Sequence, residues 1–263
     1  MLGYYRRKDL IVMDAKTFAP LYRLIKWGIA CFYKMEVVGR ENLPEGAAIL
    51  VGNHAQMNGP IACELFFPGN RYTWCASQMM EMKEVPAYAF QDFWSMKPKA
   101  VRWFYKLASY AIAPLSVLIF NNAQTIPVYH DMRVMTTFRH TVQKLEESAK
   151  IVIFPEKDEP YNGILCAFQE HFVDVASLYC RRAKKALPFV PMYICPALKK
   201  MFLGKPIYFD EDVPLEQERR RICGALMDEI TRMAESLPTH RVVPYRNMPK
   251  KDYPLNRTDE ANK

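Results

Sequence analysis

The sequence predicts an α/β fold, in which a mixed, mostly parallel sheet is flanked by helices. Three short apolar runs have the composition of strands that are buried on both faces: "AAILVG" (47–52), "KIVIFPE" (150–156) and "LPFVPMYI" (187–194). Helical patterns at about 133–149 and 168–185 precede the second and third runs. This alternation of strand and helix is typical of parallel sheets that are covered by helices.

A chain of 263 residues is long enough to form one such domain. We expect three parts: an N-terminal membrane-interface helix at 1–35, an α/β domain at 36–238, and a basic, proline-containing tail at 239–263. The prolines of the tail predict that it is extended or disordered.

The composition restricts the partners. Lys and Arg number 36 against 28 Asp and Glu, a net charge of +8, which favours an anionic partner: nucleic acid, an anionic membrane or a phosphorylated ligand. The seven cysteines are scattered without a CxxC pair, so we expect reduced thiols in a cytosolic compartment rather than disulfides or a zinc site.

No Walker loop, Rossmann glycine fingerprint or HExxH metal motif occurs, so we expect no bound metal or cofactor. The N-terminus lacks the apolar core of a signal peptide.

The segment "AKTFAPLYRLIKWGIACFYK" (15–34) predicts an amphipathic helix without an acidic residue. At 100° per residue, Lys16, Arg23 and Lys34 lie within about 20° of one line, and the rest of the circumference is mostly apolar. A basic stripe on an apolar helix is the pattern of an interfacial membrane helix. A core helix with a basic, solvated edge fits the same pattern.

A second, helical segment that suits a membrane surface is expected at about 97–120. The chain has no Asp or Glu between Phe93 and His130, where basic residues and aromatic rings alternate. Basic residues beside Trp and Tyr match the headgroup region of a bilayer. The apolar run "LASYAIAPLSVLIF" is short for a span, so we expect a hairpin dipping into one leaflet or a core segment. The run is too apolar to line a hydrated groove that binds nucleic acid, so a membrane is favoured over nucleic acid as the partner.

The strand "AAILVG" leads into "NHAQMNGP" (53–60), which places His54 at the carboxyl end of a buried strand. Sites in open α/β sheets gather beyond these strand ends. Pro60 suits the first turn of a following helix. Three more strand ends carry conspicuous residues: "TIPVYHD" (125–131), "FPE" (154–156) and Pro191. The last helix is expected at 216–237, where apolar residues recur at helical spacing.

Taken in order, the blocks resemble the glycerolipid acyltransferase superfamily, the relatives of lysophosphatidate acyltransferase. That family reads roughly "v.G.EnlP..g..ilv.NHxxxxD", "IPVxR", "FPEGTRS", "f..G...lA" and "vPivPv". The counterparts here are "VVGRENLPEGAAILVGNH" (37–54), "IPVYH" (126–130), "FPEKDEP" (154–160), "FQEHFVDVA" (168–176) and "LPFVPMYI" (187–194). The resemblance spans residues 36 to about 194, and the chain is identified as a divergent member.

The resemblance implies transfer of a fatty acyl chain from acyl-coenzyme A or acyl carrier protein to a hydroxyl of a membrane lipid, with His54 as general base. It implies no bound cofactor, no nucleic acid, and a peripheral location on the cytoplasmic side of a membrane. The chain departs from the family at four positions. Gly59 stands where the family has the aspartate that orients the histidine, His130 replaces an arginine, residues 157–160 replace "GTRS", and His171 replaces a glycine.

We therefore expect Asn58, one residue before Gly59, to orient His54 as a neutral partner, or else to be a turn residue before Gly-Pro. The residues expected to bind substrate are His130, Arg133, Glu156, Lys157, Asp158, Tyr161 and Asn162. The alternative function is a catalytically inactive relative that acts as a membrane-associated lipid-binding or scaffold protein.

Overall fold

The computed structural model describes residues 15–95 and 97–257, with side chains from residue 19 onward. The chain forms two compact units. The first contains residues up to Cys31 and Gln78–Ala123, and the second contains Phe32–Ser77 and the chain from Gln124 onward. The expected acyltransferase-like domain at 36–238 therefore contributes to both units.

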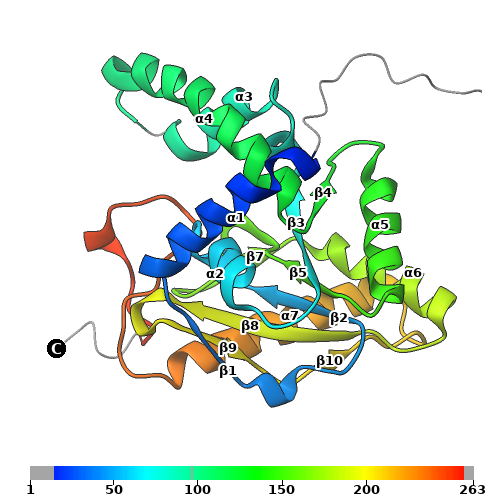
Figure 1. Ribbon diagram of the computed structural model, residues 1–263. Helices are drawn as coiled ribbons and strands as arrows, with labels where there is room; N and C mark the ends of the chain where they lie inside the picture. The colour runs from blue at the N-terminus through cyan, green and yellow to red at the C-terminus, as the bar shows by residue number, and fades with distance from the viewer. Residues whose placement is uncertain (1–14, 96, 258–263) are drawn as a thin grey trace, which may run out of the picture. The chain divides into compact units, whose positions relative to one another are not determined.

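The second unit is built around an eight-stranded sheet, counted over the described residues (Figure 1). The strand order is β1-β9-β8-β2-β5-β3-β4, and β10 pairs with β8. The strands are β1 (Glu36–Val38), β2 (Ala48–Gly52), β3 (Arg71–Ala76), β4 (Thr125–Val128), β5 (Lys150–Ile153), β8 (Pro188–Cys195), β9 (Lys200–Leu203) and β10 (Ile207–Tyr208). From β8 to β4 the neighbours are parallel, whereas β9 and β10 are antiparallel to β8. The prediction of a mixed, mostly parallel sheet is confirmed.

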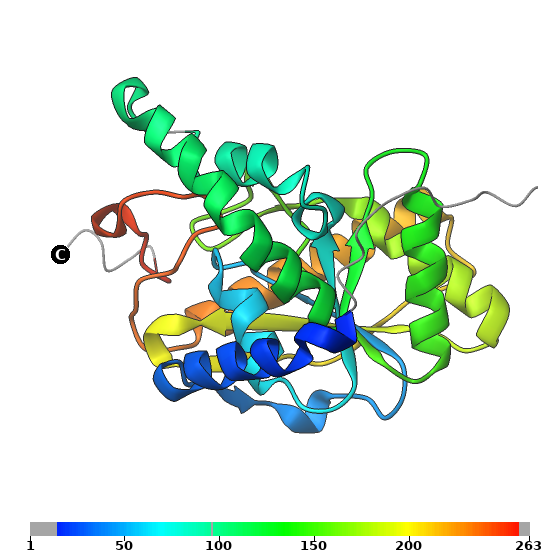
Figure 2. The ribbon, with the colours of Figure 1, turned by 45° about the horizontal axis from the view of Figure 1, so that its top comes forward.

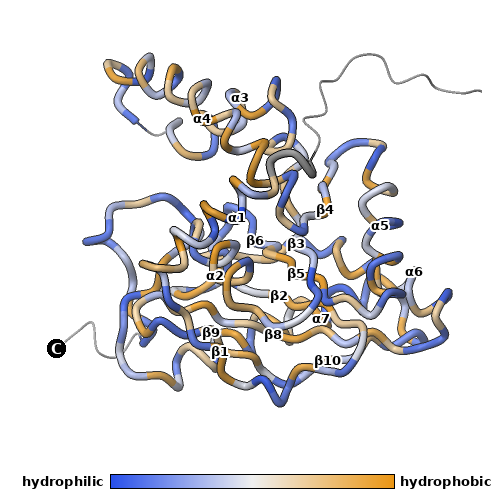
Figure 3. The backbone as a smooth tube through the Cα atoms, viewed as in Figure 1, coloured by the Kyte–Doolittle hydropathy of each residue, from blue (hydrophilic) through white to orange (hydrophobic). Residues whose placement is uncertain are grey.

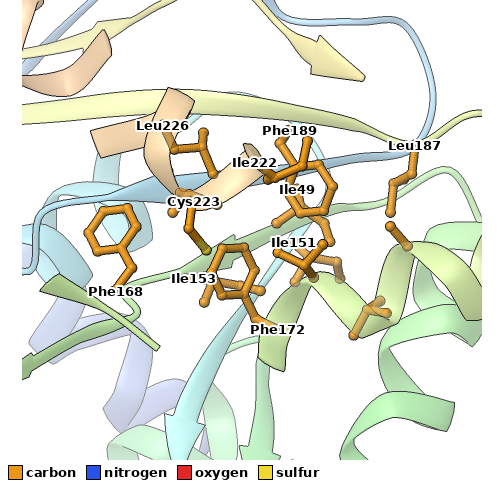
Figure 4. Packing of buried hydrophobic residues seen from close by; sticks show 14 of the residues in the cluster. Ile49, Ile151, Ile153, Phe168, Phe172, Leu187, Phe189, Ile222, Cys223 and Leu226 are labelled. Carbon is orange, nitrogen blue, oxygen red and sulfur yellow. The ribbon is translucent and has the colours of Figure 1, made fainter. Parts of the chain in front are cut away.

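The central strands are buried on both faces because their side chains alternate between two hydrophobic clusters. Parallel pairing sets Ile49 of β2 beside Ile151 of β5 and Val51 beside Ile153, and all four residues join the larger cluster. Leu50 points to the opposite face and joins the smaller one. Figure 4 shows the larger cluster, in which the isoleucines of the sheet meet Ile222 and Leu226.

Four longer helices of this unit cover the sheet. They are α2 (Asn58–Phe66), α5 (Val134–Glu146), α6 (Asp174–Ala183) and α7 (Leu215–Glu235). Buried residues of α5, α6 and α7 belong to the larger cluster, and Ala62 and Cys63 of α2 belong to the smaller one. Helices on both faces are what a parallel sheet needs to remove its apolar faces from water. Short 3-10 turns in this unit are η1 (Arg40–Asn42), η5 (Glu170–Val173), η6 (Pro196–Leu198) and η7 (Lys250–Asp252).

The strand expected at 150–156 ends earlier than predicted. β5 stops at Ile153, and Glu156 begins a separate antiparallel hairpin of β6 (Glu156–Pro160) and β7 (Cys166–Phe168). Phe154 and Pro155 make the transition between the sheet and this hairpin.

The first unit is helical over its described residues. It contains α1 (Ala15–Phe32, whose last residue belongs to the second unit), α3 (Val85–Ala89) and α4 (Arg102–Asn122). The turns η2 (Ser77–Met80) and η4 (Lys99–Val101) and the single-turn π-helix η3 (Phe90–Trp94) connect them. The helix expected at 15–34 is confirmed; the side chain of Lys16 lies outside the described residues.

α4 is one unbroken helix, visible along its length in Figure 2, although Pro114 lies inside it. The expectation of a helical segment at about 97–120 is confirmed, and of the two arrangements expected for "LASYAIAPLSVLIF" the hairpin is wrong. Residues Lys99–Asn122 make a helical segment long and apolar enough to cross a membrane. The run "LASYAIAPLSVLIF" is too short to span on its own, and the longer segment also includes the basic residues that precede this run.

The tail folds as far as the structure describes it. We call residues 239–257 the C-terminal strap. A β-bridge joins Arg241 to Leu255, and the two ends are tied by bonds between His240 and Asn256. The backbone N–H of His240 donates to Oδ1 of Asn256 at 2.8 Å, and the N–H of Asn256 donates to the carbonyl of His240 at 3.1 Å. Of the two expectations for the tail, extended or disordered, this segment fits the extended one, because it is ordered with little regular secondary structure; residues 258–263 lie outside the described residues.

Candidate active site

Asn53 ends the central strand and fixes where the chain turns away. Its buried side chain bonds to the backbone of Ile194 in β8, with Nδ2 donating to the carbonyl at 3.1 Å and Oδ1 accepting from the N–H at 2.7 Å. The amide side chain thus continues the ladder between β2 and β8 in place of the main chain. The backbone is free to leave the sheet one residue later, at His54.

His54 and Glu156 meet because β2 and β5 are parallel neighbours. Val51 pairs with Ile153, and His54 and Glu156 follow these two residues by the same three positions. The backbone N–H of His54 donates to Glu156 Oε2 at 2.6 Å, and the N–H of Cys166 donates to Oε1 at 3.0 Å. Glu156 is 3% exposed, and burial raises the pKa of its carboxyl to about 7, against the opposing effect of the two N–H donors. Glu156 holds the backbone of His54 rather than its ring.

The imidazole of His54 lies between two aromatic rings. Phe154 contacts it edge-on with centroids 5.3 Å apart, and Tyr245 of the strap does so at 6.0 Å. Burial lowers the pKa of His54, and a hydrogen bond with the backbone of Gln56 acts weakly in the opposite direction. The ring is therefore neutral at neutral pH, which is the form that can accept a proton.

The turn after His54 is strained. Ala55 and Gln56 both have left-handed backbone conformations, with φ of 46° and 55°. Such conformations cost about 1–2 kcal/mol per residue for side chains other than glycine. They persist where the surroundings fix them, as at functional sites. Here the turn places the backbone of Gln56 beside the ring of His54.

Asn58 bonds within this turn. Its Nδ2 donates to the carbonyl of Ala55 at 2.9 Å, and its Oδ1 accepts from the hydroxyl of Tyr33 at 3.3 Å. The ring of His54 has its hydrogen bond with Gln56 instead. The geometry thus supports the turn interpretation of Asn58 more than the orienting one.

Gly59 leaves no room for a side chain. A Cβ at this position would lie 2.6 Å from the carbonyl oxygen of His54 and 2.8 Å from the ring of Phe154. The N–H of Gly59 donates to that same carbonyl at 3.0 Å. An aspartate side chain at position 59 is therefore excluded, because α2 approaches the end of β2 too closely to leave space for it.

The strap crosses the loops that carry His54 and Glu156. Nε2 of Gln56 donates to the Tyr253 hydroxyl at 3.1 Å and to the carbonyl of Arg246 at 3.3 Å. The guanidinium of Arg246 pairs with Asp158 and donates to its carbonyl at 2.9 Å. Tyr245, Arg246 and Tyr253 were not found by sequence reasoning, although aromatic residues at this density are unusual for a disordered tail.

The other candidates lie apart from the imidazole. The hydroxyl of Tyr161 donates to Asp228 at 2.6 Å, and Nδ2 of Asn162 donates to Thr231 at 2.8 Å, so both fasten the hairpin turn to α7. Lys157 pairs with Glu159 at 2.5 Å on the exposed side of β6.

His130 and Arg133 follow β4, at the same edge of the sheet as His54. Strands β5 and β3 lie between β2 and β4, so three strand spacings, about 14 Å, separate the ends of β2 and β4. Arg133 pairs with Asp131 at 2.7 Å and lies over the ring of Tyr129. Across residues 15–95 and 97–257, no group of three His, Cys, Asp or Glu side chains is arranged to hold a metal ion.

Comparison with known proteins places the chain far from characterised sequences. No protein-family model and no curated protein matches it. Among solved structures, it is similar to the crystal structure of the 1-acyl-sn-glycerophosphate (LPA) acyltransferase PlsC from Thermotoga maritima. The TM-score is 0.44 and the identity 14%, over 83% of this chain and 79% of that chain.

Gly59→Ala should lower the free energy of unfolding by about 1–3 kcal/mol, because the added carbon meets backbone atoms that cannot move aside. Gly59→Asp should be at least as destabilising. The matched control is Gly224→Ala inside α7, where a Cβ would meet open space and helix propensity should stabilise the chain by up to about 1 kcal/mol. Urea unfolding of the three variants measures this. Equal stability of Gly59→Ala and Gly224→Ala would contradict the packing argument.

Glu156 should make stability fall as the pH rises from about 4.5 to about 7. The folded chain holds a proton there that the unfolded chain has lost, because burial raises the pKa of the carboxyl. The stabilisation is complete below pH 4.5 and lost above pH 7, and it amounts to roughly 3 kcal/mol. The lowered pKa of His54 gives the opposite slope below pH 6.5.

The effect of Glu156 is isolated by comparison with Glu156→Gln, which retains His54. The unfolding free energy of the wild type minus that of Glu156→Gln should fall across this interval in urea titrations. Glu159→Gln, at an exposed position of the same strand, should leave the slope unchanged. A difference that stays constant with pH would disprove the assignment.

Proposed function

We propose that this protein is an O-acyltransferase that moves a fatty acyl chain from acyl-coenzyme A or acyl carrier protein to a hydroxyl of a membrane lipid. The observation that carries the proposal is a neutral, half-buried imidazole at the carboxyl edge of a parallel sheet. A neutral imidazole has one nitrogen that donates a hydrogen bond and one that can accept a proton.

In this mechanism His54 takes the proton of the acceptor hydroxyl as its oxygen attacks the thioester carbonyl. The tetrahedral intermediate collapses, the carbon–sulfur bond breaks, and the proton passes from His54 to the leaving thiolate. Glu156 holds the backbone of His54 in position, and Phe154 and Tyr245 hold the ring. His130, Arg133 and Lys157 are candidates to bind a charged group of the acceptor.

Two aromatic rings pack against the imidazole of His54, and Gly59 stands where the resemblance places the orienting aspartate. In Ser-His-Asp enzymes, loss of the carboxylate lowers the rate by about four orders of magnitude. We therefore expect slow turnover compared with enzymes that carry the aspartate.

The second candidate is a lipid-binding or scaffold protein that retains the fold without the chemistry. Two observations favour it: Gly59 excludes the aspartate, and the ring of Tyr245 lies against His54. Such a protein would bind lipid and release no thiol from any acyl thioester.

His54→Ala separates the two functions. Cells that overproduce the wild-type chain should accumulate an acylated lipid that is absent with His54→Ala, because no other group replaces the base. His140→Ala, at an exposed position of α5, is the matched control and should retain the product. Lipid mass spectrometry measures this and identifies the acceptor. An unchanged lipid profile, with no thiol release by the purified protein, would favour the scaffold.

Tyr245→Ala should expose the ring of His54, because the strap then lacks the side chain that packs on it. The rate of modification by diethylpyrocarbonate, followed by mass spectrometry at His54, should rise severalfold relative to exposed His171 in the same sample. Tyr245→Phe keeps the ring and should behave as the wild type. Equal rates in all three proteins would show that the strap does not shield the site.

A further inference from the structure

One face of α4 exposes large apolar side chains. Trp103 is 70% exposed, Phe104 54%, Leu107 64% and Tyr110 60%. Their spacing of one, three and three residues puts them on one side of the helix. We call these four residues the α4 face. Figure 3 shows apolar residues recurring along this helix.

An adjoining side of α4 is packed within the same unit. Ala113 and Val117 join Val85 and Ala89 of α3 in a small hydrophobic cluster. Ser116 nearby is buried and donates to the carbonyl of Met79 at 2.9 Å. The helix therefore has one side that contributes to the fold and one that does not. An exposed group of four large apolar residues is rare on a soluble surface and marks a site of interaction.

The charges around the α4 face select an anionic partner. Lys97, Lys99, Arg102 and Lys106 lie on or just before its first turns, and no acidic residue occurs between Phe93 and His130. Among the residues that the structure describes, none of these four cations forms an ion pair. Lys97 instead lies 5.6 Å from the ring centroid of Tyr105, and Arg102 donates to a backbone carbonyl.

The packing of α3 against α4 determines which orientation of α4 in a bilayer is favourable. A spanning orientation of α4 would carry α3 into the hydrocarbon, together with Lys83 and Asp92 at its two flanks. Charged groups at that depth cost several kcal/mol each. A helix that lies in the membrane plane buries only its apolar side and keeps its basic residues among the headgroups.

We propose that α4 is an in-plane anchor for a membrane of anionic lipids, with the α4 face inserted at the boundary between headgroups and acyl chains. Arg102 and Lys106 contact the lipid phosphates from the same turns. This inference does not depend on acyl transfer, because binding to vesicles involves no thioester.

Sedimentation with vesicles tests the proposal. The full chain should bind vesicles of phosphatidylcholine and phosphatidylserine more tightly than vesicles of phosphatidylcholine alone, and salt should weaken binding. Lys106→Gln should reduce the partition coefficient roughly fivefold, the effect of about 1 kcal/mol per basic residue. Leu107→Ala should reduce it about tenfold through lost apolar burial. Circular dichroism confirms that each variant is folded.

Matched controls come from the second unit. Lys185→Gln removes an exposed charge from another basic cluster, and Tyr208→Ala removes a ring that is 55% exposed on β10. Both should bind vesicles as the wild type does. Equal losses in controls and α4 variants would overturn the proposal. So would tighter binding of the chain to a single-stranded oligonucleotide than to anionic vesicles, with loss of that binding in Lys106→Gln.

Depth measurements test the in-plane orientation. Brominated lipids quench tryptophan fluorescence according to its depth, and the first probe is Trp103 in the wild type. The second probe is the tryptophan introduced by Leu115→Trp in the Trp103→Phe background. Trp103→Phe alone is the baseline for both. Twelve residues of helix span about 18 Å. In-plane binding predicts shallow quenching at both positions. Depths that differ by most of this length would show a spanning helix and overturn the proposal.

Discussion

The site depends on one interaction, the carboxyl group of Glu156 that bridges the backbone N–H groups of His54 and Cys166. The bridge joins the turn that follows β2 to both strands of the hairpin, β6 and β7. An unpaired buried N–H is costly, so this one side chain satisfies two donors that the departing chains would otherwise leave open. The carboxyl of Glu156 thus has a structural role, and it is bonded to the backbone of His54 and not to the imidazole.

The surroundings of the imidazole are consistently neutral. Its contacts are a peptide group and two aromatic rings, and the nearest buried carboxyl has a raised pKa and is bound to backbone. A carboxylate beside the ring would stabilise the imidazolium. This site lacks that stabilisation, so it favours the basic form of His54 at rest and penalises the charged form that arises during proton transfer.

Much of the fold follows from local sequence. Runs such as "AILVG" and "PFVPMYIC" can only be buried strands, and their positions were predicted well. β3 was missed, although its "RYTWCA" has strand-forming residues. The positions of His54 and Glu156 at strand ends were expected, but Glu156 was expected to bind substrate, and its bond to the backbone of His54 was not predicted. The tight approach at Gly59 and the contacts of the strap could not be predicted, because they depend on tertiary packing between segments far apart in the chain.

The closure of the strap by Asn256 has a consequence for synthesis. His54, Glu156 and the sheet between them are made long before Asn256, which follows Glu156 by 100 residues. At about 5–20 residues per second, roughly 5–20 s separate the two on the ribosome. During that interval the nascent chain exposes the imidazole that Tyr245 later packs against. The site is therefore completed late in translation, after the sheet that carries it.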